Sequence, residues 1–91
     1  MPKVHADPDE ILKFAQMLKT FSQDLTKNAR VLQGQFKTLG ETWQDQQHMR
    51  FAQEFEQLMG VLHKFMQSSE EQIPLLQKKA CILKEFIESQ R

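Results

Sequence analysis

Apolar residues recur along the first half of the chain with the spacing of one face of a long helix. Ile11 begins a set of leucine-like residues that repeats every seven positions, and Phe14 and Phe21 fall between its members. Further along, the intervening apolar residues shift by one position to Ala29 and Phe36, as expected when a seven-residue repeat rotates slowly around a straight helix. The pattern predicts a helix over residues 8–39 with a continuous apolar stripe.

Both ends of this helix carry sequence signals. Asp7 is placed to act as the N-cap, Pro8 suits the first helical position, and Glu10 completes an Asp-based capping box. At the other end, Gly40 suits the C′ position that follows a helix. A turn is predicted over residues 40–45, in which Thr42 or Asp45 would cap the helix that follows.

A second apolar stripe begins with Phe51 and predicts a helix over residues 46–88. Its steps alternate between four and three, except for two consecutive steps of four around Ser69 and Ile73, beside Pro74. A proline inside a helix removes one backbone hydrogen bond and its ring clashes with an earlier carbonyl. A continuous helix kinked near Pro74 is therefore predicted, and a helix broken there, with Pro74 in the first turn of a short third helix, is the alternative.

Two long helices joined by a short turn predict an all-α fold, an antiparallel helix-turn-helix hairpin formed by one domain over residues 1–91. A lone hairpin encloses no core, and its stripes are wide, so we expect it to pair into a four-helix-bundle dimer with itself or with a related helical hairpin protein. The residues predicted to form the core or the interface are Phe14, Leu18, Phe21, Leu25, Leu32, Phe36, Phe51, Phe55, Leu58, Leu62 and Phe65.

Composition excludes several classes of function. Twelve basic and twelve acidic residues balance, and no basic cluster of the kind that binds nucleic acid or anionic membranes is present. No apolar stretch approaches the roughly 20 residues of a membrane span. Cys81 is the only cysteine, and no glutamate stands three residues before a histidine, so neither a metal site nor a cofactor is predicted. No catalytic motif is visible, and the prediction is a protein that is not an enzyme.

The predicted turn contains Trp43-Gln44-Asp45, and the helix after it carries Phe51 and Phe55. This arrangement, over nearly the whole chain, resembles the WXG family, the early-secreted-antigen-like proteins of type VII secretion systems. The Trp-x-Gly motif of the family maps onto Trp43-Gln44-Asp45, with Asp45 in place of glycine, and the aromatic residue that usually follows maps onto Phe51 or Phe55. An aspartate at this position is chemically suited to capping the second helix.

The resemblance implies a small secreted effector or secretion partner that acts as a dimeric hairpin, with a secretion ATPase as a further partner. Trp43 would then pack at the hairpin tip, form part of a recognition surface, or do both. The first eight residues lack the apolar segment of a secretory signal, so export without a cleaved signal peptide is expected. The family's Tyr-x-x-x-Asp/Glu secretion signal has no counterpart here, because the sequence contains no tyrosine. A cytoplasmic helical adaptor that is not exported is therefore the alternative.

Overall fold

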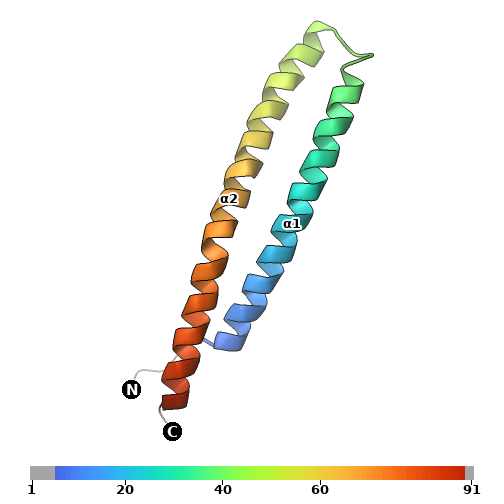
Figure 1. Cartoon of the computed structure of the whole chain (residues 1–91). Coiled ribbons are helices and arrows are strands. Elements are labelled where there is room, and N and C mark those ends of the chain that lie inside the picture. The colour runs from blue at the N-terminus through green and yellow to red at the C-terminus, as the bar shows by residue number, and fades with distance from the viewer. Residues whose placement is uncertain (1–5, 90–91) are drawn as a thin grey trace. The chain divides into compact units, whose positions relative to one another are not determined.

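The computed structural model describes residues 6–89, nearly all of which lie in two long helices (Figure 1). Helix α1 spans Pro8–Leu39 and helix α2 spans Gln46–Ser89, and the described residues contain no strand. The predicted all-α helical hairpin is confirmed. Helix α2 ends one residue later than predicted, a difference within the usual fraying of helix ends.

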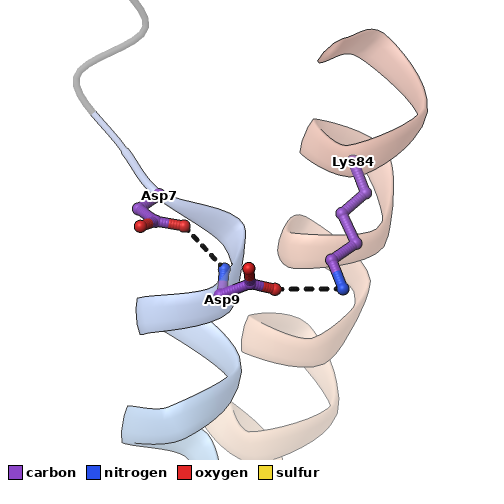
Figure 2. A network of polar contacts seen from close by, with 3 residues as sticks. All are labelled: Asp7, Asp9 and Lys84. Atoms are coloured by element: carbon purple, nitrogen blue, oxygen red, sulfur yellow. Dashed lines mark hydrogen bonds and ion pairs between the residues drawn. The ribbon is translucent and has the colours of Figure 1, made fainter. Parts of the chain in front are cut away.

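Helix α1 begins with a side-chain cap. The backbone N–H of Asp9 donates a hydrogen bond of 2.9 Å to Asp7 Oδ1, and the N–H of Ile11 donates to the Asp7 carbonyl. The Asp9 carboxylate in turn forms a 3.0 Å ion pair with Lys84 Nζ of helix α2 (Figure 2). The first turn of α1 is thus held both by its own cap and by a charge on the neighbouring helix. Because both side chains are largely exposed, this pair contributes little to stability.

The turn between the helices differs from the expected glycine cap. No described residue, glycine included, has a positive φ, so Gly40 is not in the left-handed conformation. Instead the chain leaves α1 through tight turns in which the N–H groups of Thr42 and Trp43 both donate to the Leu39 carbonyl, at 3.2 and 2.9 Å. These bonds satisfy the end of the helix, so a left-handed residue is not required there.

Helix α2 continues through Pro74 without a break. The alternative of a separate third helix is therefore not observed. Pro74 is exposed. The partly buried residues on both sides of Pro74, Ile73 and Leu76, continue the spacing of the buried side of the helix.

The chain divides into two compact units, and each is described by itself. The terminal unit combines residues 1–21 with residues 68–91, of which 6–21 and 68–89 are described. The turn unit comprises residues 22–67 and contains the connection between the helices. In each unit, a segment of α1 runs against a segment of α2 in the opposite direction (Figure 1).

Small side chains occupy the most buried positions in the contact between the helices. Ala15 and Ala80 are 1% and 0% exposed, and Ser22, Ala29 and Ser69 are also buried. Among the described residues, no large side chain is fully buried. Small residues let two helices approach closely. Alanine and serine therefore occupy closely packed positions, and the larger side chains remain partly or fully exposed.

The buried side of α2 follows an unbroken alternation of three and four residues. We call these positions, with their counterparts on α1, the seam; on α2 they are Ala52, Phe55, Met59, Leu62, Met66, Ser69, Ile73, Leu76, Ala80 and Leu83. The stripe read from the sequence, with two consecutive steps of four, was wrong before Ser69, because it followed Phe51, Leu58 and Phe65. Each of these residues lies one position before a seam residue and is exposed.

The seam of α1 corrects the sequence pattern in the same way. Its positions are Pro8, Ile11, Ala15, Leu18, Ser22, Leu25, Ala29 and Phe36. Phe14 and Phe21 were expected on the stripe that faces α2, yet they are 57% and 55% exposed while Ala15 and Ser22 beside them are buried. A seven-residue repeat continues on α1, with Ala15, Ser22 and Ala29 at its most buried positions and Leu18 and Leu25 half-buried between them.

Candidate interaction surfaces

Large apolar side chains of the terminal unit gather on one side of its seam. Phe14 and Phe21 immediately precede the seam residues Ala15 and Ser22 on α1, and Phe86 precedes Ile87 on α2. In an antiparallel pair of helices, residues that precede the seam on either helix project to the same side. Met17, Leu75 and Ile82 adjoin them and are also exposed. The result is an apolar surface that both helices build.

The turn unit carries a matching surface. Phe51, Leu58 and Phe65 precede seam residues on α2, with Val61 next to them, and Val31 lies on the corresponding side of α1. Leu58 is 51% exposed and Phe65 is 42% exposed. We refer to this surface, and to the corresponding surface of the terminal unit, as the apolar face of each unit.

The predicted core and interface residues separate into two groups. Half-buried in the structure are Leu18, Leu25, Phe36, Phe55 and Leu62. Exposed are Phe14, Phe21, Leu32, Phe51, Leu58 and Phe65. The first group lies in the contact between the helices. All of the second group belong to the apolar face except Leu32, which lies seven residues after the seam residue Leu25 and is 49% exposed.

An aromatic cluster joins the turn to the two helices of the turn unit. The Phe36 ring of α1 stacks on Phe55 with centroids 4.6 Å apart, and it stacks on His48 at 5.3 Å with an interplanar angle of 10°. Trp43 meets His48 edge-on at 5.0 Å, and lies 6.2 Å from Phe51. The cluster therefore closes the end of the hairpin with ring contacts, which add to the stabilisation from burial alone.

Asp45 caps helix α2. Its Oδ1 accepts a 3.0 Å hydrogen bond from the backbone N–H of His48, and its carbonyl accepts from the N–H of Met49. The bond from the His48 backbone is the main cause that lowers the pKa of the Asp45 carboxyl below its ordinary value of 3.8, and a hydrogen bond from the Trp43 side chain acts in the same direction. Of the two predicted caps, Asp45 is the one used. The residue that departs from Trp-x-Gly thus links the tryptophan to the start of the helix.

His48 is the member of the cluster that sequence reasoning missed. It lies between the rings of Phe36 and Trp43, and its buried Nε2 has no hydrogen-bond partner. Gly40 is close by, since a Cβ there would lie 3.5 Å from His48 Nε2. The one available signal was that His48 stands at the seam spacing, four residues before Ala52.

A hollow of about 450 Å³ lies between the helices of the turn unit, on the opposite flank from the apolar face. Its floor is apolar and consists of Phe36, Ala52, Phe55 and Met59. Gln33 and Lys37 of α1 form one rim, and Glu56 of α2 forms the other. We refer to this hollow as the groove.

Metal and membrane chemistry find no support in the part of the chain that is described. Over residues 6–89, no group of three or more metal-ligating side chains comes together. Neither of the two helices contains a segment long and apolar enough to cross a bilayer.

The chain was compared with known protein families and with curated proteins. A family model described as proteins of 100 residues with WXG, WXG100, matches residues 3–80. This range includes the turn with Trp43 and Asp45, all of α1, and α2 as far as Ala80. No curated protein matched the chain.

Proposed function

Because the chain belongs to the WXG100 family, whose small helical members are associated with type VII secretion and typically pair with related helical proteins, we propose that it functions as a dimeric hairpin in a type VII-like secretion system. In this role it is a secreted effector or the partner that accompanies one. It acts through association and carries out no catalysis.

The observation that carries this proposal is the apolar face. In both units, large side chains of α1 and α2 lie exposed on one side of the seam, while the most buried seam positions include alanine and serine. A surface of this kind, built from two adjacent helices, is suited to packing against a second pair of helices in a four-helix bundle. The second pair belongs to another copy of the chain or to a related hairpin.

Magnitudes favour pairing over a solitary hairpin. Fully burying a large apolar side chain is worth about 1.5–3 kcal/mol, and these residues are about half exposed. Covering the apolar face would therefore contribute on the order of 10 kcal/mol before the costs of association. Since a whole domain is typically stable by only about 5–15 kcal/mol, pairing decides whether the fold is stable.

The turn is the natural place for recognition by other secretion components. Trp43 is half-buried and is held by the His48 ring, and Asp45 fixes the start of α2 beside it. A glycine at this position would allow a tight turn before α2 through its conformational freedom. Asp45 instead stabilises the start of α2 by accepting a backbone hydrogen bond. This keeps the tryptophan at a defined position when the hairpin pairs.

Export is tested in the native host with a tagged chain, by comparing culture fluid from cells with and without the secretion ATPase. We expect the chain in the fluid only when the ATPase is present, and less of Trp43→Ala than of the control Gln44→Ala. A chain that stays inside the cells in both strains, at wild-type abundance, would instead support a cytoplasmic helical adaptor. A gene for an FtsK/SpoIIIE-type ATPase or for a second hairpin beside this one would favour secretion.

A further inference from the structure

The groove lies on the side of the turn unit that pairing would leave open. Its rim residues follow seam positions, as Lys37 follows Phe36 and Glu56 follows Phe55, whereas residues of the apolar face precede them. Residues that follow and residues that precede the seam project to opposite flanks of an antiparallel pair. A partner hairpin on the apolar face would therefore leave the groove accessible.

The size and lining of the groove fit a protein side chain. A hollow of about 450 Å³ with a floor of Phe36, Ala52, Phe55 and Met59 can accept one or two large apolar side chains. Met59 is unbranched and flexible, so it can adjust to the shape of what enters. A third helix can pack into the space between two neighbouring helices, with its side-chain ridges in their grooves.

A glycine on the α2 wall admits a close approach. Gly60 lies in the interior of α2, next to Met59 and one turn beyond Glu56, and a Cβ added there would meet nothing within 4 Å. Glycine in a helix interior costs about 1 kcal/mol relative to alanine, and no contact within the described chain requires it. Close packing of another protein's backbone against this part of α2 would explain why position 60 is a glycine.

The charges of α1 beside the groove indicate which kind of helix could bind there. Lys27, Arg30 and Lys37 are the charged residues of α1 between Asp24 and Glu41, so this stretch is uniformly basic. Arg30 and Lys37 are seven residues apart and lie on one line along α1, with Lys37 on the rim of the groove and Arg30 two turns before it, beyond the lining. Within the described residues no ion pair occupies either of them. The complement of the α1 side is a line of carboxylates, whereas Glu56 on the α2 rim is complemented by a basic or uncharged position.

We infer that the groove is a second docking site, distinct from the pairing surface, for an amphipathic helix of another protein. That helix inserts one or two large apolar side chains between Phe36 and Met59, places acidic residues along Arg30 and Lys37, and packs its backbone against Gly60. The site does not depend on secretion, so it can exist even if the proposed function is wrong.

The test uses a display library of helical peptides with one central Leu or Phe and randomised flanks, selected on the full-length chain. We expect enrichment of peptides with acidic residues on one flank. Their binding should weaken by about tenfold or more with Lys37→Glu and with Gly60→Leu, and should persist with Gln57→Glu, a control on the outer surface of α2. Amide shifts in ¹⁵N-labelled protein should map to Gln33, Lys37 and Gly60.

Three results would overturn the inference. They are the absence of any enriched family, binding that is indifferent to both groove variants, and shifts confined to Phe51 and Leu58. Helicity and solution mass are measured for each variant, because both substitutions are at exposed positions and should leave folding and pairing intact. A Lys37→Glu chain with altered mass would show that the groove is instead a contact between copies.

Discussion

The terminal unit and the turn unit hold their helices together in different ways. In the terminal unit, the tightest contacts are made by Ala15, Ser69 and Ala80, and the polar link is an exposed ion pair between Asp9 and Lys84. In the turn unit, the rings of His48, Phe51 and Phe55 of α2 pack around Phe36 of α1, and Trp43 of the turn packs on His48.

This difference predicts that the two units of the hairpin depend on a partner for their stability to different degrees. Stacked rings bury apolar area within the chain, so the turn unit contributes stability of its own. In the terminal unit the most buried positions include alanine and serine, which bury little area, and the large side chains beside them remain exposed. We therefore expect the terminal unit to depend on pairing more strongly than the turn unit does.

The largest effect is expected from Phe36→Ala. Removing the ring that contacts His48, Phe51 and Phe55 should destabilise the protein by about 3 kcal/mol, at the lower end for phenylalanine truncations because Phe36 is only half-buried. Thermal melts at fixed protein concentration measure the effect. Phe14→Ala is the control, since Phe14 is 57% exposed, and it should lower association more than intrinsic helicity. Equal losses of stability for the two variants would contradict the claim that seam residues stabilise the hairpin itself and that residues of the apolar face mainly serve association.

Ala80→Leu should destabilise by about 2 kcal/mol. Ala80 is 0% exposed, so a larger side chain must force the helices of the terminal unit apart. The matched control is Cys81→Leu, at the next residue, which is exposed and should be nearly neutral. Chemical denaturation curves compare the two. If Ala80→Leu is tolerated as well as Cys81→Leu, the small-residue seam is not a constraint.

Ser22→Ala is expected to stabilise the protein by about 1 kcal/mol. The Ser22 hydroxyl is buried and has no hydrogen-bond partner, and replacing such a group with a methyl group removes a desolvation cost. Denaturation midpoints provide the measurement, with Ser68→Ala, at an exposed position, as control. A destabilised Ser22→Ala would mean that the hydroxyl has an essential contact in the paired protein.

The smallest effect concerns Asp45 and pH. Because the pKa of Asp45 is lowered in the folded state, its charged cap stabilises the fold above the ordinary pKa of 3.8, and this contribution is lost as the pH falls through the lower folded value. Asp45→Asn keeps a capping oxygen without a titrating charge. Melting temperatures of the two proteins should differ at about pH 6 and converge towards about pH 2. A difference in melting temperature that does not change with pH would contradict a stabilising role for the charge of the Asp45 cap.

Much of the fold could be predicted because its signals are local. Asp7 and Pro8 marked the start of α1, and the interval from Leu39 to Gln46 was too short for anything except a turn. The error lay in choosing which stripe faces the other helix. Phe14 and Ala15 are both compatible with a seven-residue repeat, and hydrophobicity alone favours the larger residue. Close helix packing favours the smaller one, and that preference appears only when two helices meet.

The aromatic cluster and the groove could not be predicted for a related reason. Phe36, His48 and Phe55 come together only once the register between α1 and α2 is set, and the register depends on the geometry of the turn. The tight turns on the Leu39 carbonyl, where a glycine cap was expected, fix that geometry. The sequence shows each ring separately and gives no indication of the partner that it will meet.

The central claim is that large side chains were left outside the seam for pairing, and solution mass measured by light scattering with helicity tests it most directly. We expect the helical wild-type chain, or its mixture with a related hairpin, to have a dimer mass, about twice the 10.8 kDa of one chain. Leu58→Asp, on the apolar face, should lose mass and helicity together, and Gln53→Asp, on the opposite flank of α2, should lose neither. A wild-type chain that is well folded and monomeric at every concentration would contradict the account.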